Sequence, residues 1–172
     1  MLVDDEINVL HALRRNLRSV PGEEEMKLEI YTDPQQALTR AQEIAFDIVI
    51  SDYRMPKMNG VEFLQTFKTI QAETVRLMLS ASTEFGTLVN VINQAEVFRF
   101  IAKPWQTFEL KETIQLAFAR RDQLMEDLRL FNALRAQCGE MTPQEFEAKR
   151  LEQDEPGITK VKWGADGSVQ LD

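Results

Sequence analysis

The sequence predicts a doubly wound α/β domain, in which a five-stranded parallel sheet is covered by helices on both faces. Along the first 120 residues, five short runs rich in Val, Ile, Leu and Phe alternate with segments whose apolar residues recur at helical spacing. Strands that alternate with helices of about 10 to 15 residues are typical of parallel sheets. The 172 residues, of which 44% are hydrophobic and 28% charged, suit one such domain with an appendage.

Each apolar run is short and is bounded by polar or turn-forming residues, as buried strands are. The first run has few residues before Asp4, where a strand of about five or six is usual, so this strand is expected to be stunted or cut short. The expected strands are Met1–Val3, Met26–Tyr31, Phe46–Ser51, Val75–Ala81 and Val97–Ala102.

Helices are expected between these strands and after the last one. The second helix has a clear start, because Thr32 and Asp33 provide a cap and Pro34 suits the first helical position. The apolar stripes that mark the helices are Ile7, Leu10, Leu13 and Leu17; Ala37 and Ala41; Val61, Leu64 and Phe67; Phe85, Leu88, Val89 and Ile92; and Phe108, Leu110, Ile114 and Ala117.

The fifth helix continues well beyond the sheet domain. Neither proline nor glycine occurs between Gln106 and Gln137, so one helix ending near Gly139 is predicted. Its apolar residues follow a heptad seam, in which arginines interrupt the pattern and Leu134 offers a shifted contact. Such a seam favours pairing with a second copy or a partner over packing on its own domain. The seam comprises Leu110, Ile114, Ala117, Arg121, Leu124, Leu128, Phe131, Arg135 and Cys138.

The last part of the chain forms an appendage in this interpretation. Thr142, Pro143 and Glu145 form a capping box with proline at the first helical position, which predicts a short helix to about Gln153. Alternating residues on both sides of a Gly-Ala-Asp-Gly turn predict a hairpin from Ile158–Trp163 and Ser168–Leu171. The expected organisation is a sheet domain over 1–120, a helix continuation with a coiled coil over 121–139, and an appendage over 140–172.

Composition excludes several classes of protein and site. The net charge of −8 provides no basic face for nucleic acid. One cysteine and one histidine exclude an intramolecular disulfide and multi-histidine or cysteine-based metal sites. No run approaches the roughly 20 apolar residues that span a bilayer, and the acidic start lacks the features of a secretory signal. These absences favour a cytoplasmic protein without direct membrane contact.

Chemically active side chains follow four of the predicted strands. In a parallel α/β sheet the carboxyl ends of the strands share one edge, so these groups are expected to converge. Carboxylate oxygens suit Mg²⁺, and a carboxylate can attack a phosphoryl group to form an acyl phosphate. Metal, hydroxyl and ammonium groups stabilise the charge on the transferring oxygens. The converging residues are Asp4, Asp5, Asp52, Ser80 and Lys103.

Each of these residues has an ordinary structural interpretation when taken alone. Asp4 and Asp5 suit a helix N-terminus, and Asp52 suits a turn before a Pro-Gly loop. Ser80 is typical of a buried hydroxyl, and Lys103 of a surface lysine. Their joint occurrence at four ordered strand ends favours a common site.

Four motifs, LVDDE, DIVISDYRMPKMNG, LMLSAS and FRFIAKPW, occur in this order at the expected strand ends. Together they resemble the response-regulator receiver domain of two-component signalling, over about residues 1–120. The resemblance implies a flavodoxin-like sheet with strand order 2-1-3-4-5, followed here by the extended helix and the helix-plus-hairpin appendage. It also implies a switch that assists its own phosphorylation and dephosphorylation, rather than a metabolic enzyme.

The resemblance implies a role for each motif residue. Asp52 would be the phospho-acceptor, while Asp4, Asp5, Asp52 and the Arg54 backbone carbonyl would hold Mg²⁺. Ser80 and Lys103 would each bind a phosphoryl oxygen. Phe100 occupies the aromatic switch position, and the Lys103–Pro104 peptide bond would be cis. Arg54 and Ser82 occupy positions that tune dephosphorylation, and we hypothesise that Arg54 lies over the acyl phosphate.

The phosphoryl donor implied by the resemblance is a sensor histidine kinase or a histidine phosphotransfer protein. Phosphorylation would switch a protein-interaction face and alter pairing of the long helix in a homodimer. Two alternatives stay open. The chain would be the regulatory part of a longer protein with a cyclic-dinucleotide enzyme or DNA-binding output, or an unphosphorylated dimerisation module. The intact set of site residues argues against the second alternative.

Overall fold

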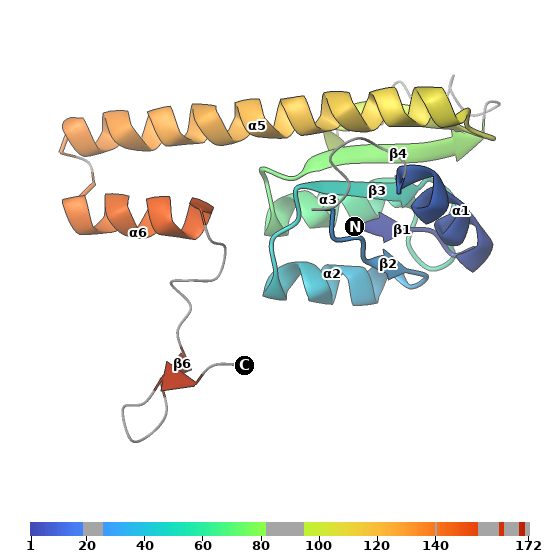
Figure 1. Cartoon of the computed structure of the whole chain (residues 1–172). Helices are drawn as coiled ribbons and strands as arrows, with labels where there is room; N and C mark the ends of the chain where they lie inside the picture. Colours follow the sequence, from blue (N-terminus) through green and yellow to red (C-terminus); the bar gives the residue numbers. More distant parts are fainter. Residues whose placement is uncertain (19–25, 82–94, 140, 155–161, 164–168, 171–172) are drawn as a thin grey trace. The chain divides into compact units, whose positions relative to one another are not determined.

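The computed structural model contains the predicted five-stranded parallel sheet, and its strand order is β2-β1-β3-β4-β5 (Figure 1). It describes residues 1–18, 26–81, 95–139, 141–154, 162–163 and 169–170. The predicted fold class is therefore confirmed, including the long helix that follows the sheet. The strands of this sheet are β1 (Leu2–Val3), β2 (Ile30–Tyr31), β3 (Ile48–Asp52), β4 (Val75–Ala81) and β5 (Arg99–Lys103).

The strand bounds differ from the predicted ones at β1, β2, β3 and β5, and β3 begins at Ile48 and ends at Asp52. In β1 only Leu2 and Val3 pair with their neighbours, so β2 at the edge has partners for only Ile30 and Tyr31. The apolar run before Ile30 therefore lies outside the strand. β5 begins and ends later than predicted, since Arg99 is the first of its residues to pair with β4. An edge strand is limited by the length of the neighbour to which it bonds.

The described helices form where the apolar stripes predict them, but two residues of these stripes, Ile7 and Phe108, are exposed, at 44% and 75%. Their bounds are α1 (Ile7–Leu17), α2 (Pro34–Glu43), α3 (Gly60–Ile70), α5 (Thr107–Gln137) and α6 (Pro143–Asp154). The predicted helix around Phe85–Ile92 lies outside the described residues. Within the described ranges, no helix combines the length and the apolarity that crossing a bilayer requires.

Both faces of the central strands are buried, as a doubly wound sheet requires. On one face, Val3, Val49 and Met78 join a cluster with buried residues of α2 and α3, including Phe63 and Phe67. Residues that alternate with these along the strands point to the opposite face, and they are also buried. On this second face the buried residues of the strands and of helices α1 and α5 include Leu2, Ile50, Leu77, Leu10, Leu13, Leu110 and Ile114.

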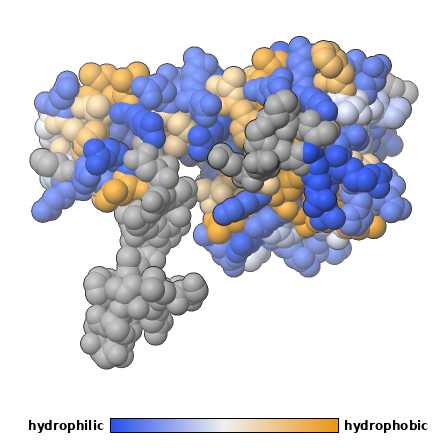
Figure 2. Space-filling model, viewed as in Figure 1, coloured by the Kyte–Doolittle hydropathy of each residue, from blue (hydrophilic) through white to orange (hydrophobic). Residues whose placement is uncertain are grey.

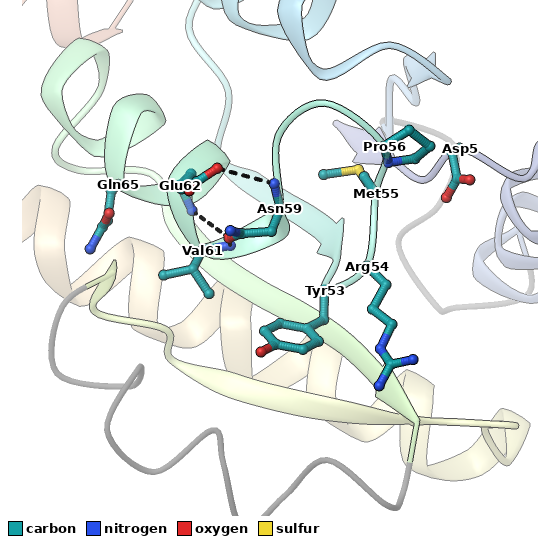
Figure 3. A pocket seen from close by; sticks show the side chains of 9 residues that line it. All are labelled: Asp5, Tyr53, Arg54, Met55, Pro56, Asn59, Val61, Glu62 and Gln65. Atoms are coloured by element: carbon teal, nitrogen blue, oxygen red, sulfur yellow. Dashed lines mark hydrogen bonds between the residues drawn. The ribbon is translucent and has the colours of Figure 1, made fainter.

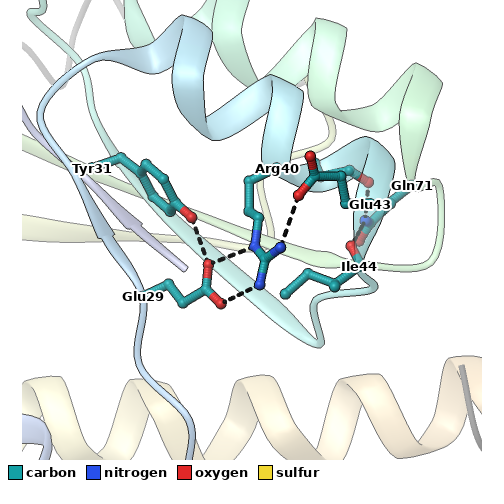
Figure 4. A network of polar contacts seen from close by, with 7 residues as sticks. Glu29, Tyr31, Arg40, Glu43, Ile44 and Gln71 are labelled. Atoms are coloured by element: carbon teal, nitrogen blue, oxygen red, sulfur yellow. Dashed lines mark hydrogen bonds and ion pairs between the residues drawn. The ribbon is translucent and has the colours of Figure 1, made fainter. Parts of the chain in front are cut away.

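A polar network joins β2 to α2 (Figure 4). The Arg40 guanidinium donates from Nε to Glu29 at 3.2 Å and from Nη1 to Glu43 at 2.8 Å. The Tyr31 hydroxyl donates to Glu29 at 2.5 Å. Burial and the Glu29 carboxylate raise the pKa of Tyr31 to about 12, and the hydrogen bond from Arg40 lowers the pKa of Glu29. This network fixes the short edge strand to the helix that follows it.

The chain separates into two compact units, Met1–Asp122 and Gln123–Asp172, with the boundary inside α5. In the second unit, α6 begins with the predicted capping box, where Thr142 Oγ1 accepts from the Glu145 N–H at 3.2 Å. A two-stranded antiparallel hairpin follows, formed by β6 (Lys162–Trp163) and β7 (Val169–Gln170). These paired residues fall within the predicted hairpin, and its remaining residues lie outside the described part.

The heptad seam of α5 divides into two parts. Its first part belongs to the core of the sheet unit, because Leu110, Ile114 and Ala117 are buried. The next seam residue, Arg121, donates from Nε to the Asp47 carboxylate at 2.8 Å. The seam up to Arg121 is therefore used within the chain itself. This part of the seam follows the alternative of packing on its own domain.

The start of α3 is fixed tightly against the end of β3. The Asn59 side chain accepts hydrogen bonds from two helix N–H groups, and Glu62 bonds back to the Asn59 N–H, which completes a capping box. The Gly60 N–H donates to the Tyr53 carbonyl at 2.9 Å. A β-carbon at Gly60 would lie 2.0 Å from the carbonyl oxygen of Asp52. Only glycine allows this approach, which determines where the loop after Asp52 lies.

We expect Gly60→Ala to destabilise the protein by about 1–3 kcal/mol, as overpacking in a filled site does. The sign is informative, because alanine in place of glycine within a helix otherwise stabilises by about 1 kcal/mol. Urea unfolding followed by circular dichroism measures the change. Thr69→Ala, at an exposed position of the same helix, is the control and should shift stability by no more than about 0.5 kcal/mol. A stabilised Gly60→Ala protein would contradict the close approach.

Candidate functional site

One ammonium group joins two buried carboxylates at the carboxyl edge of the sheet. The Lys103 Nζ lies 2.7 Å from Asp4 Oδ2 and 2.5 Å from Asp52 Oδ1. Asp4 is fully buried, the Asp52 side chain is 8% exposed, and the Lys103 side chain is 22% exposed. The three residues come from the ends of β1, β3 and β5. The structure thus brings together Asp4, Asp52 and Lys103, as the motifs predict.

Backbone donors fix both carboxylates from the side opposite Lys103. The Glu6 N–H donates to Asp4 Oδ1 at 2.9 Å, and the Arg54 N–H donates to Asp52 Oδ2 at 2.8 Å. Both bonds arise where the chain turns from a strand toward the next helix. Local turns therefore orient the acids, while Lys103 holds them together across the sheet. Both Asp52 oxygens accept hydrogen bonds, yet each can accept a further one.

Burial and ion pairing have opposite effects on the pKa values of Asp52 and Lys103. Burial raises the pKa of Asp52, and the nearby Asp4 charge adds to this effect, although Lys103 and the Arg54 N–H favour the ionised carboxylate. Burial of the Lys103 ammonium by itself would lower its pKa, but Asp4 and Asp52 outweigh burial, so the pKa is raised. Two acids share one cation, and the site therefore retains negative charge.

Asp5, which directly follows Asp4 in the chain, lies on the rim of an open pocket (Figure 3). The pocket has a volume of about 850 Å³ and runs from Asp5 and Pro56 at one end to Glu62 and Gln65 at the other. Tyr53, Arg54 and Met55 also line it. Sequence reasoning identified Asp5 and Arg54 but not the other lining residues. Tyr53 is an ordinary loop residue in the sequence, whereas Glu62, three residues after Asn59, fits the capping-box pattern, which indicates a helix start and not a pocket.

The residues present are compatible with Mg²⁺, although they do not form a complete protein cage. In the part of the chain that the structure describes, no three His, Cys, Asp or Glu side chains gather closely enough to coordinate one ion. Magnesium usually keeps several waters and binds through only one or two carboxylates. Asp52, and Asp5 on the rim of the pocket, offer oxygen donors of this type, and the surplus negative charge favours a cation.

The remaining predicted residues occupy the neighbouring strands. Ser80 lies in β4 and is 1% exposed, and its hydroxyl donates to the Ala81 carbonyl at 3.2 Å. Phe100 in β5 is partly buried and packs against the core cluster formed with α2 and α3. The Lys103–Pro104 peptide bond is cis, as the resemblance implies. Ser82 lies outside the described residues, so its predicted role is not addressed.

Comparisons with known proteins point to one family. The model of the response regulator receiver domain matches residues 1–115. The hydrogenase transcriptional regulatory protein HoxA of Cupriavidus necator is 30% identical over 117 residues, which cover 68% of this chain and 23% of HoxA. The cyclic di-GMP phosphodiesterase response regulator RpfG of Xanthomonas campestris pv. campestris is 26% identical over 112 residues, 64% of this chain and 29% of RpfG.

A solved structure of a receiver domain is also similar to this chain. The signal receiver domain of an HD domain-containing protein from Pseudomonas fluorescens Pf-5 matches with a TM-score of 0.66 and 27% identity. The match covers 73% of this chain and 89% of that domain. The similarity to HoxA and RpfG is limited to about a quarter of their length, so the activities of those whole proteins do not transfer with the fold.

We expect Lys103→Ala to destabilise the protein by about 2 kcal/mol at neutral pH. Removing one partner of a fully buried pair costs about 3–5 kcal/mol, and the partial exposure of Lys103 reduces this. The variant leaves Asp4 and Asp52 buried as two like charges. Since the pKa of Asp52 is already raised above its unfolded value, the folded variant binds protons more readily, and the deficit should shrink as the pH falls.

Urea unfolding at neutral pH and near pH 5 measures this difference. The control is Lys57→Ala, because the Lys57 side chain is 80% exposed and its ammonium lies 3.7 Å from Asp33. Such a surface pair contributes about 0–1 kcal/mol, so this variant should unfold almost as the parent does. A deficit in Lys103→Ala that is equal at both pH values would contradict the electrostatic cause.

Proposed function

We infer the function of this chain from the family to which it belongs, the response regulator receiver domains of two-component signalling. It acts as a phospho-accepting switch in which Asp52 receives a phosphoryl group. The observation that carries this proposal is the Lys103 ammonium, 2.5 Å from Asp52 Oδ1 and 2.7 Å from Asp4 Oδ2. The donor is a phosphohistidine of a sensor histidine kinase or of a histidine phosphotransfer protein.

In the transfer step, an Asp52 oxygen attacks the phosphorus, the bond between phosphorus and the donor imidazole breaks, and an acyl phosphate forms. The imidazole leaves with the electron pair of that bond. Lys103 and the Arg54 N–H favour the ionised carboxylate that this attack requires. Because the Lys103 ammonium already lies beside Asp52, it would bind a phosphoryl oxygen of the acyl phosphate after only a small movement.

The acidic residues of the site have a second role beside that of nucleophile. Asp5, Asp52 and the Arg54 backbone carbonyl, supported by Asp4, would hold Mg²⁺. When bound, this ion supplies positive charge that neutralises phosphoryl oxygens. The chain itself supplies the surplus negative charge that attracts the cation, because Lys103 balances only one of the carboxylates. Asp4 acts by positioning Lys103, since it is fully buried.

The switch is proposed to run from Ser80 to Phe100. Phosphorylation adds charge next to β4, and the Ser80 hydroxyl turns toward a phosphoryl oxygen. Met78 pairs with Phe100 and Ser80 pairs with Ala102, so both residues lie on the same pair of strands. Phe100 then moves into the space that Ser80 leaves, which changes the surface at β5 and the start of α5. Ser82, like Arg54, is proposed to tune dephosphorylation.

The output of the switch is proposed to be a protein contact in the cytoplasm, including a homodimer through α5. The net charge of −8 argues against direct contact with nucleic acid. HoxA and RpfG favour a second candidate, in which this chain regulates a DNA-binding or cyclic-dinucleotide output. A third candidate is an unphosphorylated dimerisation module, and the experiment below separates it from the first two.

Incubation with acetyl phosphate and Mg²⁺ should add about 80 Da to the intact mass, the mass of one phosphoryl group. Asp52→Asn should abolish the adduct, because the amide is not a nucleophile of this kind. Asp33→Asn is the matched control. Asp33 caps α2 and asparagine caps equally well, so this variant should still be modified. A folded parent protein that gains no mass would favour the dimerisation module.

Arg54→Ala should shorten the lifetime of the acyl phosphate by roughly 2- to 10-fold, a change of about 0.4–1.4 kcal/mol in the barrier. The exposed Arg54 side chain lines the pocket beside Asp52, where it would hinder the approach of water. The decay of the adduct after removal of acetyl phosphate measures the lifetime. Lys57→Ala, which removes another exposed cation of the same loop, should leave it unchanged. Equal lifetimes in the parent and in Arg54→Ala would remove the shielding role.

A further inference from the structure

Beyond Arg121, α5 presents a row of exposed apolar side chains. Leu130, Phe131 and Leu134 are 56%, 57% and 59% exposed, and together with Asp127 and Cys138 they form what we call the outer face of α5. Figure 2 shows orange, hydrophobic surface along this half of the helix. Exposed clusters of large apolar side chains typically mark interaction sites.

The position of the outer face differs from the predicted seam. Asn132, on the opposite side of the helix from Leu130 and Leu134, is only 5% exposed, and Leu128 is partly buried. The exposed positions follow the spacing of four, three and four residues that a paired helix requires. They are Asp127, Phe131, Leu134 and Cys138, and the apolar Leu130 widens the row.

Charge decides how a second copy would fit this face. In a parallel pair each residue meets its own counterpart, so the two Asp127 carboxylates would face each other within the seam, which is destabilising. In an antiparallel pair Phe131 of each copy packs against Leu134 of the other. Asp127 then lies beside Cys138 and Arg135 of the other copy, so that opposite charges flank the apolar centre. The face is therefore self-complementary only in the antiparallel arrangement.

We propose that two copies of this chain pair antiparallel through the outer face of α5, with Phe131 of each against Leu134 of the other. The interface has two-fold symmetry and buries the same patch twice. Arg135 already lies over the Phe131 ring, with its guanidinium carbon 5.8 Å from the ring centroid. Its charge therefore stands at the edge of the apolar centre. This inference gives a geometry to the homodimer put forward above and rests on it.

Cys138, the single cysteine of the chain, allows a direct test of direction. Asp127→Cys places a second thiol where the antiparallel pair brings it beside Cys138 of the other copy. Oxidation with copper phenanthroline should then give a covalent dimer on a non-reducing gel. The parent protein and the double variant Asp127→Cys/Cys138→Ser should remain uncrosslinked. Crosslinking of both these controls would indicate a parallel pair and overturn the proposal.

The contribution of the apolar centre is tested by measuring the monomer–dimer equilibrium. Leu134→Glu should raise the dissociation constant of the dimer at least tenfold in analytical ultracentrifugation, while its circular dichroism spectrum stays that of the parent. Leu151→Glu on α6, where the leucine is 40% exposed, is the matched control and should leave the dimer intact. A monomeric parent protein, or equal dissociation constants for the parent and Leu134→Glu, would overturn the proposal.

The charge pairing has a separate test. Asp127→Arg should weaken the dimer, and the double exchange Asp127→Arg/Arg135→Asp should restore it. The mass adduct at Asp52 is measured in the same proteins. Its presence in a chain that does not dimerise would reject the pairing and keep the receiver function, whereas a dimer without the adduct would do the reverse.

Discussion

The shared ammonium of Lys103 is the constraint on which the rest of the structure depends. Asp4, Asp52 and Lys103 are far apart in the sequence and meet only if β1, β3 and β5 end at one edge of the sheet. Two buried acids with one cation are costly, because each carboxylate loses hydration. The apolar strands and helices around the site stabilise the fold enough to tolerate this. The same imbalance supplies the negative charge that a cation and a phosphoryl transfer can use.

Much of this site is predictable from the sequence, because each functional residue follows a recognisable apolar run. The loop after Asp52 is predictable too, since Asn59 and Gly60 mark the start of a helix. The ends of β2 are not, because they depend on how few residues the short β1 offers for pairing. The buried Arg76 is also unpredictable. Its guanidinium donates to backbone carbonyls of Ala95 at 3.0 Å and of Thr74 at 2.8 Å, and no side-chain pattern reveals such partners.

The heptad seam shows what periodicity can and cannot establish. Spacing predicts that α5 is long, which is confirmed, and that a heptad seam follows one side of it. Spacing does not say what covers that side. Leu110 and Ile114 pack into their own sheet unit, and Arg121 reaches Asp47 rather than a partner helix. Arg121 looks like a defect in a coiled coil. In the structure it bonds α5 to Asp47, the residue just before β3.

Phe100 lies in β5 between two anchored positions, one at each end of this strand. At the amino end of β5, the Phe98 N–H donates to the Arg76 carbonyl at 2.8 Å, while at the carboxyl end Lys103 is held by two acids. We expect phosphorylation of Asp52 to change the contacts of Lys103 and to leave the bond of the Phe98 N–H intact. α5 begins soon after Lys103, and Thr107 there bonds Asn16 of α1 at 3.2 Å. Because α5 is anchored again at Leu110, Ile114 and Arg121, we expect phosphorylation to displace α5 slightly as an intact helix and not to unfold it.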